Sequence, residues 1–167
     1  MRTAVTEQLP FIHICVWSSE AIQNFSHHHP KTNFDIVEVE KDGVEAVRDT
    51  LLNLDIRAST YDDFPSIQSS LIGGERVVVI KRLISEAPVM SYSSIVVPRI
   101  EKILVDLVCD EKILQYLHGS EMFYIYSHVV ERYNLHYDTL LRYASRRGVS
   151  EKIDSLLKHK IASPAPH

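Results

Sequence analysis

The segment that most constrains the fold is a run of β-branched residues, "RVVVIKRL", at 76–83. Consecutive valines and isoleucine of this kind indicate a strand that is buried on both faces. Such a strand must lie inside a sheet that other elements cover on both sides. The chain has 167 residues, which is enough for one continuous core. We therefore predict a single α/β domain over residues 1–161, followed by a disordered tail at 162–167.

Further strand patterns alternate with helical ones along the first hundred residues. Strands are predicted at 11–17, 34–40, 55–59 and 93–98. The segment between 44 and 54 repeats apolar residues at helical spacing, and the chain after Pro98 is predicted to be almost entirely helical. The expected fold is a mixed sheet of about five strands with flanking helices and a helical C-terminal half.

Composition argues against several classes of protein. The formal net charge of −4 does not suit a protein that coats nucleic acid through its overall field. Cys15 and Cys109 both lie in apolar runs without a CxxC spacing, which is typical of buried, reduced thiols in a cytoplasmic protein. No apolar stretch has the length of a membrane span, so we expect no contact with a membrane.

Three consecutive histidines, His27, His28 and His29, precede Pro30 at the end of a helix predicted over 20–25. Adjacent side chains splay apart, so a metal site would use only one or two of them with ligands from elsewhere. The same position suits polar groups that satisfy the last carbonyls of the helix. We favour a solvated helix end, with metal binding as the alternative, and predict neither a metal nor a cofactor.

Two carboxylates, Glu38 and Glu40, fall on one face of the strand predicted at 34–40, because side chains alternate along a strand. Metal-dependent nucleases of the restriction-endonuclease type use an acid followed by (Asp/Glu)-x-Lys on a strand. Here Lys41 is displaced by one residue, and Asp35 lies on the opposite face. We therefore favour a strand end where the glutamates meet solvent. A nuclease that uses Asp35, Glu38 and Glu40 is the alternative.

A basic cluster lies in "LLRYASRRG", near the C-terminus. Arg142 and Arg146 are four residues apart on one helical face, with Arg147 and Tyr143 beside them. Such a face could bind phosphates or an acidic partner. A plain solvated helix end, where cations are favoured, explains the same residues.

Several segments in this order resemble the C-terminal domain of the AbiEi-type antitoxin family: "VWSSEAIQNFSHHHP", "FDIVEVEKDGVEAV", "VVVIKRLISEAP", "VPRIEKILVDLVCD" and "LLRYASRRG". The resemblance covers roughly residues 14–157. It supplies no catalytic residues, and its motifs match at Pro98 and Asp106 as well as at the positions of a predicted recognition surface. That surface comprises Glu86, Glu101, Lys102, Arg142, Tyr143, Arg146 and Arg147. Lys102 and Asp106 are expected to pair on the exposed face of their helix.

The resemblance implies a non-catalytic antitoxin in a toxin–antitoxin or phage-defence pair. The implied partner is a nucleotidyltransferase-like toxin or a separate DNA-binding protein. The family's winged helix would not fit in the dozen or so residues ahead of the first predicted strand, so direct DNA binding is not expected. The competing class is the metal-dependent nuclease, and an interaction module without a toxin is a third.

Overall fold

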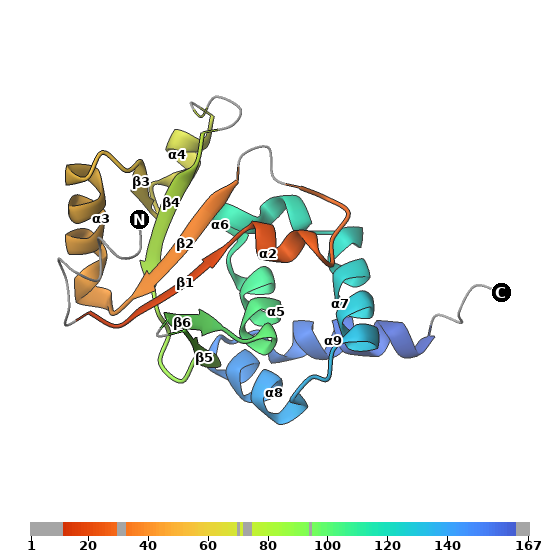
Figure 1. Cartoon of the computed structure of the whole chain (residues 1–167). Coiled ribbons are helices and arrows are strands. Elements are labelled where there is room, and N and C mark those ends of the chain that lie inside the picture. The colour runs from red at the N-terminus through yellow and green to blue at the C-terminus, as the bar shows by residue number, and fades with distance from the viewer. Residues whose placement is uncertain (1–11, 30–32, 70, 72–74, 94, 163–167) are drawn as a thin grey trace.

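The computed structural model describes residues 12–29, 33–69, 71, 75–93 and 95–162 (Figure 1). Within them, six strands form one mixed sheet in the order β3-β4-β2-β1-β6-β5. The strands are β1 (Ile14–Ser18), β2 (Phe34–Val39), β3 (Ala58–Thr60), β4 (Val77–Arg82), β5 (Val89–Tyr92) and β6 (Ile95–Pro98). The helices are α2 (Glu20–Gln23), α3 (Val44–Asn53), α4 (Phe64–Gln68), α5 (Ile100–Cys109), α6 (Glu111–Leu114), α7 (Ser120–Arg132), α8 (Tyr137–Arg146) and α9 (Ser150–Ala162), with 3₁₀ turns at Lys41–Gly43 and Gln115–Leu117.

β4 is an interior strand of the sheet with a neighbour on each side, as its β-branched sequence predicts. β4 pairs in parallel with both β2 and β3, and β1 continues the sheet antiparallel to β2. On the other side of β1, β6 runs parallel to it and β5 closes the edge as an antiparallel hairpin with β6. The carboxyl ends of β2, β3 and β4 therefore lie at the same edge of the sheet.

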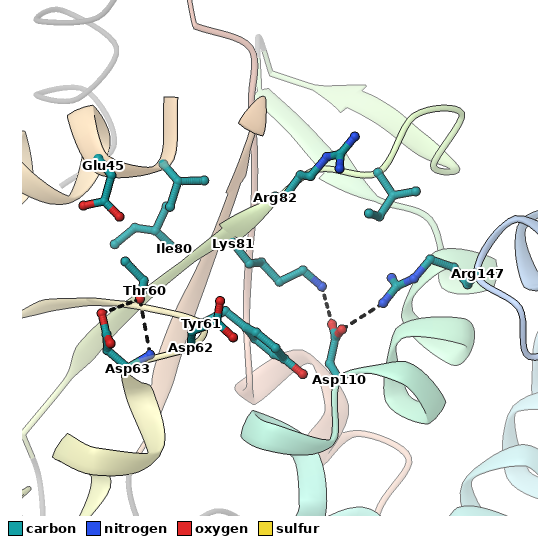
Figure 2. Close-up of a pocket in the computed structure, with 12 residues that line it drawn as sticks. Glu45, Thr60, Tyr61, Asp62, Asp63, Ile80, Lys81, Arg82, Asp110 and Arg147 are labelled. Atoms are coloured by element: carbon teal, nitrogen blue, oxygen red, sulfur yellow. Dashed lines mark hydrogen bonds and ion pairs between the residues drawn. The ribbon is translucent and has the colours of Figure 1, made fainter. Parts of the chain in front are cut away.

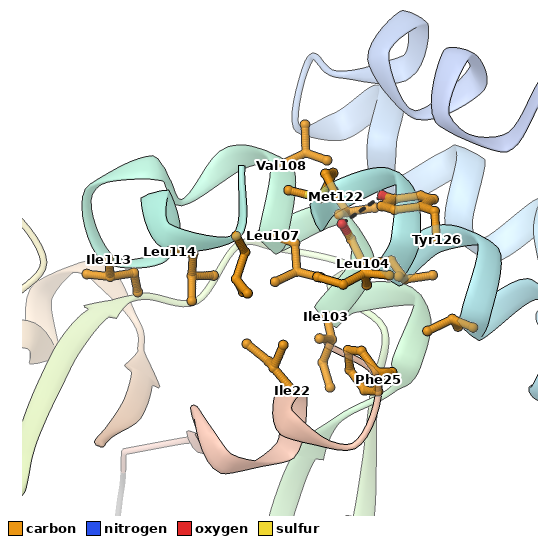
Figure 3. Packing of buried hydrophobic residues seen from close by; sticks show 14 of the residues in the cluster. Ile22, Phe25, Ile103, Leu104, Leu107, Val108, Ile113, Leu114, Met122 and Tyr126 are labelled. Atoms are coloured by element: carbon orange, nitrogen blue, oxygen red, sulfur yellow. Dashed lines mark hydrogen bonds between the residues drawn. The ribbon is translucent and has the colours of Figure 1, made fainter. Parts of the chain in front are cut away.

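Alternation along the strands sends apolar side chains to two separate cores. Ile36 and Val79 face the larger core, which also takes in side chains of α5, α7, α8 and α9. Figure 3 shows Leu104 and Leu107 of α5 packed there against Met122 and Tyr126 of α7. The opposite face of β2 and β4 packs against α3 in the smaller core, which comprises Val37, Val39, Val47, Leu51, Val78 and Ile80.

The predicted α/β class and the helical C-terminal half are confirmed. The sheet has one strand more than expected, because β5 was not predicted. Pro88 precedes it, and three of its four residues are exposed, so it lacks both the alternation and the apolar run that mark a strand. Pro98 ends β6, as the strand predicted over 93–98 requires, and α5 begins at Ile100. The helix predicted over 20–25 ends at Gln23. Residues 163–167 of the predicted tail lie outside the described residues.

Candidate functional site

Two charged side chains project from the middle of the sheet into the larger core. Glu38 follows Phe34 and Ile36 on the inward face of β2, and Lys81 holds the equivalent place on β4. The parallel register sets these two residues opposite each other. Glu38 is 0% exposed and Lys81 is 6% exposed. A buried charge is tolerated only where other charges and hydrogen-bonding groups surround it.

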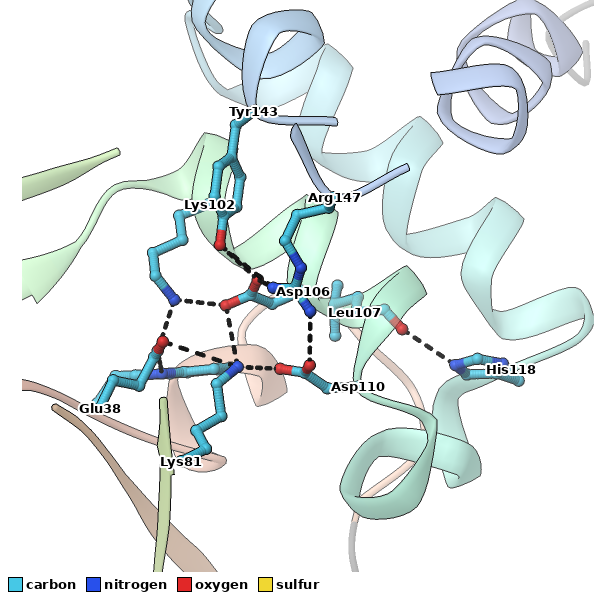
Figure 4. A network of polar contacts seen from close by, with 10 residues as sticks. Glu38, Lys81, Lys102, Asp106, Leu107, Asp110, His118, Tyr143 and Arg147 are labelled. Atoms are coloured by element: carbon cyan, nitrogen blue, oxygen red, sulfur yellow. Dashed lines mark hydrogen bonds and ion pairs between the residues drawn. The ribbon is translucent and has the colours of Figure 1, made fainter. Parts of the chain in front are cut away.

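Helix α5 and the residue that follows it supply those groups. Polar residues recur there every four positions, so one side of the helix faces the two strands with Lys102, Asp106 and, directly after α5, Asp110 (Figure 4). The Nζ of Lys102 lies 2.5 Å from Glu38 Oε1 and also pairs with Asp106. The Nζ of Lys81 pairs with Asp110 and lies 3.4 Å from Asp106 Oδ2.

Helix α8 and strand β1 complete this network. Arg147, which follows α8, donates to Asp106 Oδ1 over 2.5 Å and to Asp110 Oδ1 over 3.0 Å. The Tyr143 hydroxyl donates to the same Asp106 oxygen over 3.1 Å. From β1, the Trp17 indole N–H donates to Glu38 Oε1 over 2.9 Å.

The formal charges of the network balance, and the surroundings of Lys81, Lys102 and Asp106 favour their charged forms. The charged members, three acids and three cations, are Glu38, Asp106, Asp110, Lys81, Lys102 and Arg147. Burial alone would lower the pKa of Lys81 and of Lys102, but Asp106 and Glu38 outweigh it and raise both. Burial would raise the pKa of Asp106, yet Lys81, Lys102 and Arg147 lower it to about 2. Lys81, Lys102 and Asp106 therefore keep their charges at neutral pH.

An open cleft of about 430 Å³ lies beside the network, outside the carboxyl ends of β3 and β4 (Figure 2). The chain leaving β2 turns into α3 on one face of the sheet, whereas the chain leaving β3 turns into α4, whose Phe64 packs in the core on the other face. β4 ends between these two exits. Ligand sites of open α/β sheets form where neighbouring connections diverge to opposite faces in this way. The cleft is lined by Thr60, Tyr61, Lys81, Arg82, Asp110 and Arg147, among others.

The structure does not bring together the carboxylates of the predicted nuclease site. Glu38 lies between the ammonium groups of Lys81 and Lys102 and forms ion pairs with both. Glu40 lies beyond the end of β2 and is exposed. Asp35 points to the opposite face and accepts two hydrogen bonds from the Arg76 guanidinium. Within the described residues, no group of three or more His, Cys, Asp or Glu side chains is arranged to hold a metal ion. The prediction that Glu38 emerges into solvent was wrong.

The predicted recognition surface divides into an exposed part and a buried part. Glu86, Arg142 and Arg146 are exposed, and Arg146 Nη1 lies 3.5 Å from Glu86 Oε1. The other four, which the sequence placed on the same surface, are withdrawn from it: Glu101, Lys102, Tyr143 and Arg147.

Three of these four belong to the network described above. The pairing of Lys102 with Asp106 is present, but on a buried rather than an exposed helical face. Glu101 instead accepts a hydrogen bond from the backbone N–H of His136 over 2.9 Å. The helix over 100–109 is therefore enclosed on its polar side as well as its apolar side, which its amphipathic pattern did not predict.

The histidines dock the loop after α2 onto α7. The backbone N–H groups of His27 and His28 both donate to the buried carboxylate of Glu121. The ring of His27 stacks on Tyr124, with their centroids 3.7 Å apart. All three imidazoles are exposed, as expected for a solvated segment, but they lie beyond the end of α2 and do not cap it.

Sequence reasoning missed Lys81 and Asp110 as members of the site. Lys81 continues the inward face of the central strand after Val77 and Val79, where a lysine can only be buried with a partner. Asp110 continues the four-residue spacing of Lys102 and Asp106. It stands at the N-cap position, directly before α6, without a side-chain capping bond, because its carboxylate is directed to the network.

Comparison with known proteins gives one match. A family model described as a family of unknown function, DUF6577, matches residues 1–163. No curated protein and no solved structure matches the chain. In the described part of the chain, no helix has the length and apolar character needed to cross a membrane. The match assigns no activity, so the resemblance to antitoxins stays a prediction. The chain belongs to the DUF6577 family, whose function is unknown.

Proposed function

We propose that this chain is a non-catalytic regulatory domain that binds a partner protein through the β5 edge of its sheet. The partner expected from the antitoxin resemblance is a nucleotidyltransferase-like toxin, which the domain would counter by direct contact. The observation that carries the proposal is an apolar half-face of the sheet, which ends in an edge strand without a neighbour among the described residues.

The register of the strands identifies this half-face. Val96 of β6 lies opposite Cys15, and Cys15 lies opposite Glu38, so Val96 shares the face of the larger core. The neighbours of Val96 along β5 and β6 alternate to the other face. The smaller core under α3 extends on that face as far as β1, and among the described residues it includes none from β5 or β6. Met90 and Tyr92 of β5 stand on that second face and are 49% and 67% exposed.

Exposed apolar side chains on an edge strand are unusual in a protein that acts alone. Edge strands are commonly protected by charge, by proline or by covering segments, because their free N–H and C=O groups accept another strand. An extended segment of a partner can add to such an edge, with main-chain hydrogen bonds supplying affinity and alternate side chains supplying specificity. β5 offers an aromatic and a methionine side chain for that purpose, both enriched in protein interfaces.

The other side of β5 offers positive charge. A second cleft, of about 450 Å³, lies between the start of β5 and helix α8, and Arg99 and Arg142 line it. Arg142 is exposed and has no ion-pair partner among the described residues. A strand added to β5 would direct alternate side chains into this cleft, where an acidic residue could pair with the guanidinium. The partner segment therefore combines apolar and acidic side chains in alternation.

The state of the charged network supports a non-catalytic role. General acid–base catalysis at neutral pH uses groups whose pKa lies near the operating pH. Here the pKa of Asp106 is lowered and those of Lys81 and Lys102 are raised, so all three move away from neutrality. Burial raises the pKa of Cys15 to about 12 and that of Cys109 to about 11, which disfavours the thiolate that a nucleophile requires.

A growth assay tests the proposal. The product of the neighbouring reading frame, which the resemblance leads us to expect to be nucleotidyltransferase-like, is expressed in a permissive host, with or without this chain on a second plasmid. Rescue of growth by the wild-type chain is expected, as is loss of rescue by Met90→Asp and Tyr92→Asp. Leu52→Asp is the matched control, because Leu52 is also apolar and 48% exposed but lies on α3.

Three outcomes would contradict the proposal. A neighbour that is harmless, or toxicity that the wild-type chain does not relieve, removes the antitoxin role. Rescue by all three variants removes β5 as the interface. Cleavage of DNA or RNA by the purified chain with Mg²⁺ or Mn²⁺, lost in Glu40→Ala, would establish the nuclease instead.

A further inference from the structure

We propose that the cleft at the carboxyl ends of β3 and β4 binds a small ligand that carries a carboxylate or phosphate group on a flat ring. The site lies away from β5, at the opposite part of the sheet, so it is separate from the proposed partner interface. Its place between the exits toward α3 and α4 is where open α/β sheets hold ligands. Its volume of about 430 Å³ lies within the range that accepts small molecules.

Three of the four carboxylates that line the cleft are ion-paired, and Asp63 is the one without a cation partner among the described residues. Glu45 lies 2.6 Å from Arg48 Nη1, and Asp62 pairs with Lys112. Asp63 accepts a hydrogen bond of 2.7 Å from the Thr60 hydroxyl.

Asp110, at the rear of the cleft, accepts from both Lys81 and Arg147 (Figure 2). It is thus bound by two cations of the network, and it faces the cleft together with them. The rear wall is therefore not a site for a cationic ligand.

Among the described residues that line the cleft, Arg82 is the cation whose side chain is left to bind a ligand. It ends β4 and is exposed, and although its backbone pairs with Val39 of β2, its side chain has no hydrogen bond or ion pair to another described residue. Its neighbour Lys81 is drawn inward by the network, whereas Arg82 alternates to the other face of the strand. A guanidinium presents paired donors that match the oxygens of a carboxylate or phosphate. The guanidinium of Arg82 lies in a part of the cleft that is open to solvent.

Tyr61 gives the cleft a flat apolar wall. Its ring is partly buried against the larger core, and the Lys112 Nζ lies 5.4 Å from the ring centroid. Burial, followed by the charge of Asp110, raises the pKa of the Tyr61 hydroxyl, so this hydroxyl remains a donor. An aromatic ring of a ligand can pack on such a wall in an offset or edge arrangement. Arg82 and Tyr61 line the same cleft from opposite faces of the sheet, so a ligand that contacts both must carry its oxyanion and its ring at opposite ends.

The test is a titration of the full chain followed by amide and arginine side-chain NMR signals. The probes are benzoate, phenyl phosphate and inorganic phosphate. Comparing the first two distinguishes a preference for carboxylate from one for phosphate, and comparing the last two shows whether the ring contributes to binding. We expect benzoate or phenyl phosphate to shift signals of residues 60–63 and 82–84, including the Arg82 side chain. Arg82→Gln should weaken binding at least about tenfold, the factor expected for a lost charge-assisted hydrogen bond.

Two further variants make the result specific. Arg142→Gln is the matched control, because Arg142 is also exposed and unpaired among the described residues but lines the other cleft, and it should bind the probes as the wild type does. Tyr61→Leu should weaken the ring-bearing probes and leave inorganic phosphate unchanged. Three results would overturn the proposal. The first is the absence of chemical-shift changes at millimolar probe. The others are an affinity of Arg82→Gln for the probes equal to that of the wild type, and a loss of affinity in Arg142→Gln equal to that in Arg82→Gln.

Discussion

Replacing Lys102 by methionine is the sharpest perturbation of the charged network. Methionine keeps an unbranched side chain of similar length and removes only the ammonium group. Lys102 is 0% exposed, and its pKa is raised, so in the native protein it is buried and charged. Its loss leaves three carboxylates facing two cations, and Glu38 keeps only the Trp17 N–H at 2.9 Å and Lys81 at 3.7 Å.

The expected cost follows from that imbalance. Removing one partner of a buried ion pair destabilises a protein by about 3–5 kcal/mol, because the remaining charge stays buried without compensation. Total stabilities of domains are about 5–15 kcal/mol, so the loss is a large fraction of the whole. Adding Glu38→Gln removes one carboxylate and restores the balance. The double variant should therefore be more stable than the sum of the two single effects predicts, by at least about 1 kcal/mol.

Urea unfolding followed by tryptophan fluorescence measures these effects directly. Trp17 is the only tryptophan of the chain, is 6% exposed and is hydrogen-bonded to Glu38, so its emission reports on the network itself. Lys158→Met is the matched control: Lys158 pairs with Asp154 at the same four-residue spacing as Lys102 with Asp106, but 70% of its side chain is exposed.

The control should cost at most about 0.5 kcal/mol. Equal midpoints for Lys102→Met and Lys158→Met, with unchanged slopes, would refute the reasoning, since the network would then contribute no more than an exposed pair.

Three further outcomes are expected. The pKa of Asp106 is lowered from 3.8 to about 2, which adds roughly 2 kcal/mol to the free energy of unfolding. This stabilisation is present above about pH 4 and is lost as the pH falls through about 2. A free energy of unfolding that stays constant across that range in acid titration would contradict this. The buried thiol of Cys15 and the partly buried thiol of Cys109 should both react with a disulfide reagent more slowly in the folded chain than in urea, and equal rates would contradict this protection. Gly148→Ala should cost about 1 kcal/mol in thermal unfolding, because Gly148 ends α8 at φ +71° with open space around it, and an unchanged midpoint would count against a conformational cause.

The sequence predicted the fold class because its strongest signals are local. The run at 77–80 requires a sheet covered on both faces, and the strict alternation around Ile36 sets which residues of β2 point inward. The sequence does not predict β5, because this exposed edge strand lacks an alternation of apolar and polar residues. Alternation alone also aligned Glu38 with Phe34 and Ile36. The pattern therefore assigns Glu38 to the inward face, whereas its place near the end of the strand predicts exposure to solvent.

The charged network was not predictable from one sequence for a different reason. Its members come from β2, β4, α5 and α8, and the contact of Glu38 with Lys102 spans 64 positions. Only the spacing of Lys102, Asp106 and Asp110 is visible locally, and the same spacing is typical of an exposed helical face. Which of the two applies depends on what packs over α5, and that is set by tertiary structure.

The most direct test of the proposed function is hydrogen exchange of the backbone amides of β5, measured for the chain alone and in complex with the neighbouring gene product. The account predicts rapid exchange of the outward amides over 89–92 in the free chain, because this edge has no neighbour among the described residues. It predicts strong protection of the same amides in the complex, as a strand of the partner adds to the sheet. Protection already present in the free chain, or protection in the complex confined to other elements, would contradict the account.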